Sequence, residues 1–485
     1  MSPFSANACK SYFSDTFTFF LSFFPSKKKE KKKENNIMLC LSCVSQSYEW
    51  GVLGLASKVA HLQKEGSKSA TFPEGVPISP TTPYAELWMG THPNGPSKIG
   101  DMLLQTYLIE NPHCLGAGGP YSVDSALPFL LKVLSVGKAL SVQAHPDRTL
   151  AQTLHASRPD LYKDDNHKPE MAVALTPFEA MCSFRAPQDM ATRLHATPEL
   201  RKLAGEKDTD TLLSAATSGS QQDFETALRV WYTALMNAPR ERVEACSSEL
   251  GTRLSIRKNG VTGGLEGDVE GEGCGYSLLS PDWVAYRLLQ QYPGDVGVFA
   301  PYILNCIRLH PGSSLFLGAN EPHAYLAGDC VEIMATSDNV VRAGLTPKFK
   351  DVPTLVSMLS YKASGANGLT ITSPPTRVSE VHTVEHTIEY SSPVPEFRIL
   401  VTRVVGDSAG GAKDAKVFSL CAVNGPSILL VTKGAGAVSW TDPRGGSGSA
   451  DLQEGAVWFI SAELSVSLKA SATGIELFRA LPNSI

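Results

Sequence analysis

A glutamine and a histidine stand two positions apart in the stretch Ser-Val-Gln-Ala-His-Pro-Asp, residues 141–147. Alternate side chains of a strand point to one face, so Gln143 and His145 would project together, with Ser141 beside them. Glutamine is a poor acid, base and nucleophile, but its carbonyl oxygen is a neutral ligand. Taken alone, the pair fits a satisfied polar cluster in a β core; with further ligands nearby it would indicate a metal site.

A second stretch supplies further ligand types. It reads His167-Lys168-Pro169-Glu170-Met171, and the proline keeps Lys168 extended, so Lys168 and Glu170 share a face. Together with Gln143 and His145, Glu170 would give an amide oxygen, an imidazole nitrogen and a carboxylate. This mixture suits a borderline divalent ion such as zinc in a catalytic site with open positions, and the neutral amide leaves the ion more electrophilic.

The strand-rich stretch 317–348 holds the remaining candidates. His323 begins a strand after a turn and would complete four ligands, with Tyr325 on its face. The ionisable residues Glu332, Asp338, Arg342 and Lys348 follow within 16 residues of one another. Such groups are costly in an apolar β region unless they meet across a pocket. Arg342 and Lys348 would offer positive charge to a phosphate or a developing oxyanion.

Strand-like and helical segments must position these residues. The chain is strand-rich from Met38 to about Arg185, including a strand at 133–142 that enters a loop at Pro146. Residues 186–250 change to helical spacing, with helices expected at 189–203, 223–237 and 239–250, and another at 282–292. Within 223–237, one buried stripe is formed by Phe224, Leu228, Trp231 and Leu235.

Strands return from Val296, with paired strands at 302–317. The end of the chain predicts a small antiparallel barrel or sandwich, with strands at 417–423, 427–433, 437–440, 455–460 and 465–468. The glycine-rich, acidic stretch 259–275 predicts a flexible loop. It lacks the Gly-Lys-Ser/Thr of a phosphate-binding loop.

Composition narrows the classes of function. The 485 residues are 42% hydrophobic and 19% charged with a net charge of −5, which predicts globular domains and argues against a nucleic-acid partner. The ten cysteines are scattered, and only Cys40 and Cys43 form a C-x-x-C, so reduced thiols in a cytoplasmic protein are expected.

Residues 1–37 differ from the rest of the chain. The run Phe17–Phe24 is too short to span a bilayer, and its lysines follow rather than precede it, unlike a secretory signal. We interpret the segment as a disordered extension or an upstream start that the folded protein does not need. A targeting or membrane-surface role is the alternative.

Two other histidine patterns carry less weight. Residues 382–386 match the H-x-x-E-H of some zinc proteases, but flanking prolines and β-branched residues favour a strand, where that chemistry lacks its helix. His92, in Thr-His-Pro-Asn-Gly, is expected to be a turn residue.

In combination, the motifs resemble the type I phosphomannose isomerases, which are zinc-dependent mannose-6-phosphate isomerases of the cupin superfamily. The resemblance rests on the stretches at 48–51, 84–93, 127–136, 141–147, 166–172, 323–329 and 331–348. It implies a mainly β fold with cupin-like barrel or jelly-roll domains and a helical insert. The expected parts are an extension at 1–37, a catalytic domain at 38–185 and 297–366, an insert at 186–296 and a β domain at 367–485.

The resemblance also implies roles for individual residues. The zinc ligands of the family match Gln143, His145, Glu170 and His323, and its catalytic arginine matches Arg342. Pocket positions match Trp50, Lys132, Ser141, Lys168, Tyr325, Glu332, Asp338 and Lys348. The group that transfers the proton stays open among Glu332, Asp338, His167 and Lys168.

The implied activity is reversible isomerisation of mannose 6-phosphate and fructose 6-phosphate through a cis-enediol. It would use one zinc ion per chain and supply mannose 6-phosphate for GDP-mannose synthesis. We expect a cytoplasmic monomer whose only partner is the phosphosugar, with no membrane or nucleic acid. The alternatives are a non-enzymatic metal-binding cupin that binds phosphosugars, or a metal-dependent dioxygenase, which would need iron and an apolar channel.

Overall fold

The computed structural model describes residues 37–117, 126–259, 269–273, 275–372, 387–405, 417–420 and 422–483. All of them lie in one unit of the chain, residues 35–485. The expected extension before Ile37, the H-x-x-E-H motif and most of the glycine-rich stretch fall outside the described residues.

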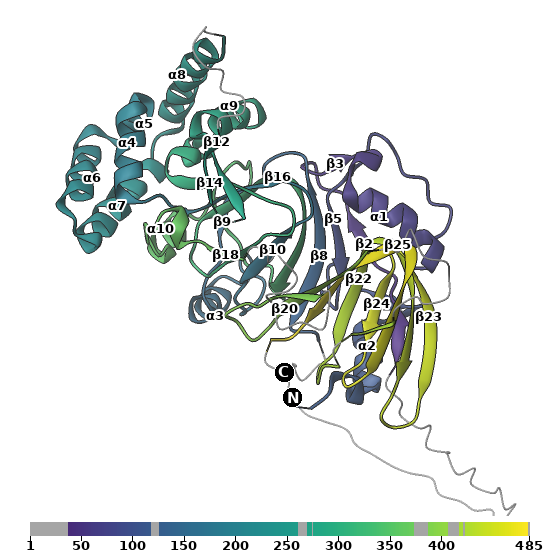
Figure 1. The fold of residues 1–485 in the computed structure, drawn as a ribbon. Coiled ribbons are helices and arrows are strands. Elements are labelled where there is room, and N and C mark those ends of the chain that lie inside the picture. The colour runs from purple at the N-terminus through teal and green to yellow at the C-terminus, as the bar shows by residue number, and fades with distance from the viewer. Residues whose placement is uncertain are drawn as a thin grey trace, which may run out of the picture. The chain divides into compact units, whose positions relative to one another are not determined.

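A large sheet carries the residues expected to do chemistry, and it contains 13 of the described strands. They are β2 (Val44–Gln46), β5 (Glu86–Met89), β8 (Phe129–Val136), β9 (Val142–Ala144), β10 (Glu170–Ala174), β11 (Phe178–Phe184), β12 (Val269–Gly273), β13 (Tyr276–Leu279), β14 (Leu304–Leu309), β15 (Ser314–Leu317), β16 (His323–Ala335), β17 (Val341–Gly344) and β18 (Thr370–Thr372). The long strand β16 pairs with β8, β9, β10 and β11, so it gathers the candidate segments around itself (Figure 1).

A bend at Gly328 divides β16 into two parts that pair with different strands. Residues before it pair with β11, and those from Gly328 to Ala335 pair with β8. Gly328 has φ +106°, and a Cβ there would lie 2.5 Å from the Pro177 carbonyl oxygen, so no other residue fits without strain. The bend separates His323 from Glu332 on the same strand.

A smaller sheet contains eight of the described strands and joins both ends of the described chain. They are β1 (Met38–Cys40), β19 (Thr387–Tyr390), β20 (Arg398–Val404), β21 (Val417–Leu420), β22 (Ser427–Thr441), β23 (Ser447–Gln453), β24 (Val457–Ile460) and β25 (Ser465–Leu481). Short ribbons are formed by β3 (Val52–Leu53) with β4 (Pro83–Tyr84) and by β6 (Lys98–Ile99) with β7 (Met102–Leu103). One buried core includes Leu131 and Val133 of the large sheet and Ile428 and Phe459 of the smaller sheet, so the two sheets pack together.

The described residues form ten α-helices, several of which begin at a residue whose side chain caps the first turn. They are α1 (Lys58–Gly66), α2 (Leu104–Glu110), α3 (Arg148–Ser157), α4 (Pro187–Ala196), α5 (Pro198–Ala204), α6 (Glu206–Ser218), α7 (Gln221–Met236), α8 (Arg240–Asn259), α9 (Pro281–Gln291) and α10 (Val352–Met358). Short 3-10 turns occupy Gly54–Ala56, Ser67–Ser69, Pro112–Leu115, Val296–Tyr302 and Ala366–Gly368. Helices α4–α8 gather to one side of the large sheet in Figure 1, while β22–β25 lie on its other side.

The prediction of a mainly β fold with a helical insert is confirmed. The stripe on α7 is buried as predicted, and the Ser220 side chain caps the helix by accepting from the Asp223 N–H. The division at residues 185, 296 and 366 stays a prediction.

Several element boundaries differ from the prediction. The expected helix at 189–203 is two helices, because Pro198 lacks an N–H and begins α5 instead of continuing α4. The expected strand at 133–142 ends at Val136, and a separate short strand, β9, begins at Val142. Within the expected loop 259–275, Val269–Gly273 form strand β12. The expected strands 427–433 and 437–440 form one strand, β22, with register shifts near Gly434.

No helix among the described residues is both long and apolar enough to cross a bilayer.

Candidate active site

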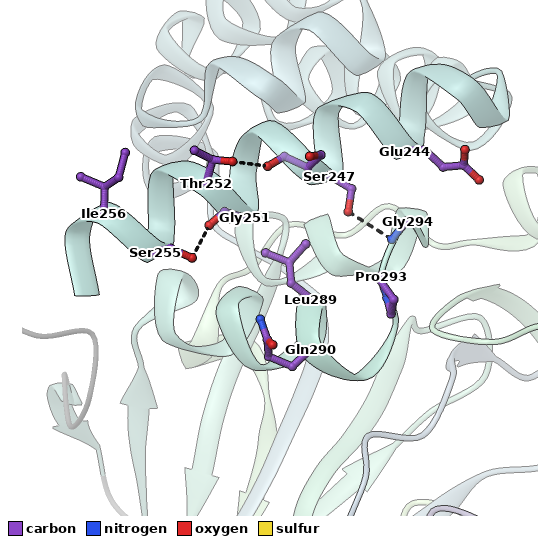
Figure 2. Close-up of a pocket in the computed structure, with 11 residues that line it drawn as sticks. Glu244, Ser247, Gly251, Thr252, Ser255, Ile256, Leu289, Gln290, Pro293 and Gly294 are labelled. Carbon is purple, nitrogen blue, oxygen red and sulfur yellow. Dashed lines mark hydrogen bonds between the residues drawn. The ribbon is translucent and has the colours of Figure 1, made fainter. Parts of the chain in front are cut away.

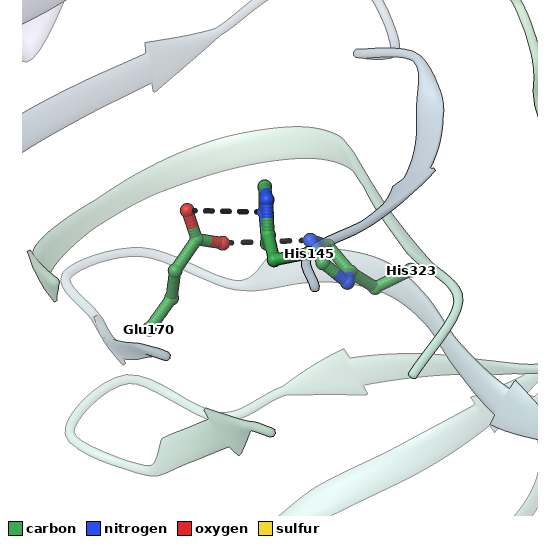
Figure 3. Close-up of side chains that lie close together, drawn as sticks. All are labelled: His145, Glu170 and His323. Atoms are coloured by element: carbon green, nitrogen blue, oxygen red, sulfur yellow. Dashed lines mark ion pairs between the residues drawn. The ribbon is translucent and has the colours of Figure 1, made fainter. Parts of the chain in front are cut away.

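Three buried side chains converge where β9, β10 and β16 meet. His145 follows β9, while Glu170 and His323 begin their strands, and all three are at most 3% exposed. Each oxygen of the Glu170 carboxylate faces one imidazole (Figure 3). The Nε2 atoms of His145 and His323 lie 3.5 and 3.4 Å from these oxygens. The three ligand atoms lie within 4.8 Å of one another, which is compatible with one shared metal ion.

The two imidazoles present free lone pairs to this point. His145 Nδ1 lies 2.7 Å from the Asn339 carbonyl oxygen, and His323 Nδ1 lies 3.0 Å from that of Glu321. Because a carbonyl oxygen only accepts, each Nδ1 carries a proton, and in the neutral form of the ring this leaves Nε2 as an acceptor. Both Nε2 atoms are buried and without a hydrogen-bond partner among the described residues. Such oriented, unpaired nitrogens fit a metal ion.

The charges also suit a cation. Burial lowers the pKa of His145 to about 4, so its ring is neutral at physiological pH. Burial opposes ionisation of Glu170, yet the pKa of this carboxyl is held well below its usual range, first of all by the positive charge of Lys168. The Lys168 ammonium lies 3.1 Å from the carboxylate. The group therefore combines one anion with two neutral donors.

Gln143, the fourth candidate ligand, lies beside His323 in the β9–β16 register. Its Oε1 accepts a hydrogen bond of 3.0 Å from the Ser141 hydroxyl. Residues 141 and 145 flank β9 instead of lying within one long strand, but Gln143 is half-buried and lines a large cavity.

That cavity has a volume of about 1370 Å³ and lies next to the buried group. Among the residues predicted for the site, it is lined by Trp50, Lys132, Ser141, Gln143, Lys168, Asp338, Arg342 and Lys348. His145, Glu170, His323, Tyr325 and Glu332 are not part of its lining. Gln143 lies beside His323 and Lys168 contacts Glu170, and both residues also line the cavity, so they link the buried group to it.

A lysine between two carboxylates forms the next cluster. Lys132 Nζ lies 3.2 Å from Glu332 Oε2 and 3.8 Å from Glu86 Oε2, with all three side chains buried. The β5–β8–β16 register places Trp88, Lys132 and Glu332 in one row. Trp88 donates to Glu86, and Lys132 lies 5.2 Å from the ring centroid of Trp88.

The two carboxylates that were left open as proton-transfer groups have opposite environments. Burial raises the pKa of Glu332 above its usual range, and the nearby Glu170 and Glu86 add to this while Lys132 opposes it. The hydrogen bond from His92 lowers the pKa of Asp338. Glu332 is thus the carboxyl closer to proton exchange near neutral pH.

Arg342 and Lys348 supply positive charge without acidic partners among the described residues. Arg342 pairs with Gln143 in the β17–β9 register and is half-buried, and burial lowers the pKa of its guanidinium. Lys348 is exposed at the mouth of the cavity. Tyr325 is buried behind the lining, and its hydroxyl has no hydrogen-bond partner among the described residues.

A second cavity, of about 1080 Å³, lies between α8 and α9. Figure 2 shows that its wall consists largely of small residues of α8, and Glu244 is the one titratable residue among those that line it. The Ser255 and Thr252 hydroxyls bond to carbonyl groups of their own helix. The lining of this cavity therefore offers a single carboxylate, whereas the first cavity brings lysines, an arginine and carboxylates together.

Comparison with known proteins identifies the family. Family models of phosphomannose isomerase type I match residues 38–187 (catalytic domain) and 203–304 (helical insertion domain). The Bos taurus mannose-6-phosphate isomerase is 41% identical over 446 residues, which cover 91% of this chain and 97% of that protein. The chain belongs to the type I phosphomannose isomerases. Mannose-6-phosphate isomerase 1 of Arabidopsis thaliana is 39% identical, over 92% of this chain and 94% of that protein.

Solved structures of this family agree. The apo form of mannose 6-phosphate isomerase from Salmonella typhimurium has a TM-score of 0.69 and 27% identity, covering 92% of this chain and 99% of that chain. A zinc-bound mannose 6-phosphate isomerase has the same TM-score, identity and coverage. The family resemblance inferred from the sequence motifs is confirmed.

Two residues of this phosphomannose isomerase site were missed by the sequence analysis. Glu86 lies in the stretch that supported the family resemblance, where its alternation with Trp88 was the available signal. His92 was assigned only to a turn, yet it is 3% exposed and lines the cavity beside Asp338.

Proposed function

We propose that the protein is a zinc-dependent isomerase that interconverts mannose 6-phosphate and fructose 6-phosphate. The observation that carries this proposal is the buried His145–Glu170–His323 group beside a cavity that also contains Lys132 and Arg342. Support comes from the names of the relatives and from the zinc-bound relative of the same fold.

Gln143, His145, Glu170 and His323 would hold one zinc ion. When bound, zinc supplies Lewis-acid polarisation of substrate oxygens. The chain fits this role because it offers one carboxylate, two neutral imidazoles and an amide oxygen on adjoining strands.

The reaction moves a proton between C1 and C2 of the open-chain sugar through a cis-enediol. We assign the proton transfer to Glu332 acting through Lys132, because burial raises the pKa of this carboxyl towards the range in which it can both accept and donate. Lys132 lines the cavity and links it to this carboxylate at 3.2 Å. Asp338 stays ionised and instead helps to orient the sugar and the nearby lysines.

Arg342 would stabilise negative charge on the enediolate oxygen, since its guanidinium has no carboxylate to neutralise it among the described residues. Arg342 lies beside Gln143 in the β17–β9 register, so its positive charge is close to the candidate metal ligands. Lys348 and Ser141 would bind the phosphate, Lys168 would hold Glu170 and polarise the sugar, and Trp50 and Tyr325 would shape the pocket.

The product mannose 6-phosphate would feed GDP-mannose synthesis in the cytoplasm, and the protein would act as a monomer without membrane or nucleic-acid partners. The catalytic domain would comprise residues 38–185 and 297–366, with the insert at 186–296 and the β domain at 367–485.

A coupled assay tests this function. Purified protein loaded with zinc is mixed with mannose 6-phosphate, and fructose 6-phosphate is detected with a coupling enzyme. Turnover that depends on zinc is the expected result. Binding of the phosphosugar without turnover would reject the enzyme in favour of a phosphosugar-binding cupin.

A further inference from the structure

Glu396 belongs to the segment between β19 and β20 of the smaller sheet, yet its carboxylate contacts segments of the large sheet. Its Oε1 accepts a 2.6 Å hydrogen bond from Arg148 Nη2 and lies 2.8 Å from His167 Nε2. These two nitrogens are 2.9 Å apart. Glu396 is 5% exposed, so its charge is buried between the two partners.

Arg148 and His167 are each close in sequence to a candidate metal ligand. Arg148 begins α3 three residues after His145, and His167 precedes Glu170 by three residues with the stiff Pro169 between them. One carboxylate therefore joins the two segments that present these two candidate ligands. The His167 segment also carries Lys168, which lies 3.1 Å from Glu170.

A buried carboxylate is costly to ionise unless its partners are held firmly. Burial disfavours ionisation of Glu396, but the hydrogen bond and charge of His167 and the charge of Arg148 outweigh it and lower the pKa of this carboxyl. The Oε1 atom of the ionised group contacts both partners, so it links residues 145–148 to residues 167–170.

We infer that Glu396 is a positioning residue through which the smaller sheet fixes the geometry of the metal site. This inference rests on the proposed function. It predicts that loss of the carboxylate loosens Glu170 and Lys168, so that zinc dissociates faster and kcat falls. KM should change less than kcat, because the side-chain partners of Glu396 are Arg148 and His167 and not the residues assigned to phosphate binding, Ser141 and Lys348.

The test compares Glu396→Gln with a matched control. Glu454, between β23 and β24, likewise pairs a lysine and a histidine, with Lys58 Nζ at 2.8 Å and His61 Nε2 at 3.0 Å, but neither partner is close in sequence to a candidate metal ligand. Each variant is measured well below its Tm for kcat, KM and the rate of zinc transfer to a chromogenic chelator.

The expected result for Glu396→Gln is a loss of about tenfold or more in kcat and in zinc retention, as for other partners that orient metal ligands. Glu454→Gln should leave both unchanged. In a double-mutant cycle, Arg148→Gln should add little once Glu396 is Gln, because the two act together.

Equal zinc release and kcat in the Glu396→Gln and Glu454→Gln proteins would overturn the positioning role. A wild-type protein without turnover would reject the proposed function instead. In that case the comparison of zinc release alone still decides the role of Glu396.

Discussion

His92 donates a hydrogen bond to Asp338 across the wall of the cavity. Its Nδ1 accepts from the Asn94 N–H at 3.2 Å, so Nε2 carries the proton of the neutral ring and faces Asp338 Oδ1 at 3.3 Å. Asn94 Nδ2 donates to the other carboxylate oxygen at 2.9 Å. The His92 ring is held edge-on against Trp88, with centroids 4.9 Å apart, so the donor is fixed in place.

Replacing His92 with Phe should raise the pKa of the Asp338 carboxyl. The His92 hydrogen bond lowers the pKa of Asp338 in the folded protein. The stabilisation of the fold by this hydrogen bond is therefore fully present above the pKa that Asp338 has in the unfolded chain. It is lost as the pH falls through the pKa that Asp338 has in the folded protein. Without the donor that pKa rises, and Asp338 becomes protonated sooner on acidification. The titration profile of the Asp338 carboxyl, followed by NMR, measures the shift.

A suitable control is His155→Phe, because His155 bonds to the Tyr162 carbonyl oxygen and does not line the cavity. A His92→Phe profile that coincides with those of the control and the wild type would contradict the proposed link to Asp338.

Removal of zinc should abolish activity and lower Tm, and added zinc should restore both. The physical reason is that His145 and His323 bury unpaired Nε2 atoms that a metal would satisfy. Thermal unfolding and turnover are measured before and after treatment with a strong chelator. Full turnover in verified metal-free protein would refute the metal role.

Glu332→Gln should lower kcat by about 10²–10⁴-fold, the usual contribution of a positioned acid–base group. Zinc content should stay the same, since Glu332 is not one of the grouped metal residues. The matched variant Asp338→Asn should lose less. If Asp338→Asn proved the more damaging in kcat, the proton-transfer role would pass to Asp338.

Arg342→Ala should lower kcat by about 10²–10³-fold, the range seen when one group that stabilises an oxyanion is removed. Lys348→Ala, at the exposed mouth of the cavity, should instead raise KM more than it lowers kcat. Kinetics and metal analysis of both variants separate these effects. Loss of zinc from the Arg342→Ala protein would show that the arginine is structural.

The candidate metal ligands could be predicted from the sequence because they lie in short motifs, in which the local backbone decides where the side chains point. Pro169 fixes Lys168 and Glu170 on one side, and His323 follows a turn. The strand assumed around Gln143 was too long, yet β9 still brings Gln143 next to His323 through pairing with β16.

Contacts between distant segments could not be predicted in the same way. Glu86 meets Lys132 only through the β5–β8 pairing, and Glu396 meets His167 across 229 positions of sequence. Glu396 has no local pattern that separates it from a solvated surface residue, and the alternation of Glu86 with Trp88 does not show which residue Glu86 will contact. A buried partner from another part of the chain appears only when the sheets have packed.

The pairing of β1 with β24 has a consequence for how the protein is made. Met38 lies opposite Ile460, and the Ile37 N–H bonds to the Ser461 hydroxyl at 3.1 Å. During synthesis, the first strand of the described chain must wait for a partner that leaves the ribosome more than 400 residues later. Closing so long a loop is slow, and until then β1 offers an unpaired edge to other chains. Truncations before residue 457 should therefore aggregate even though every candidate catalytic residue is present.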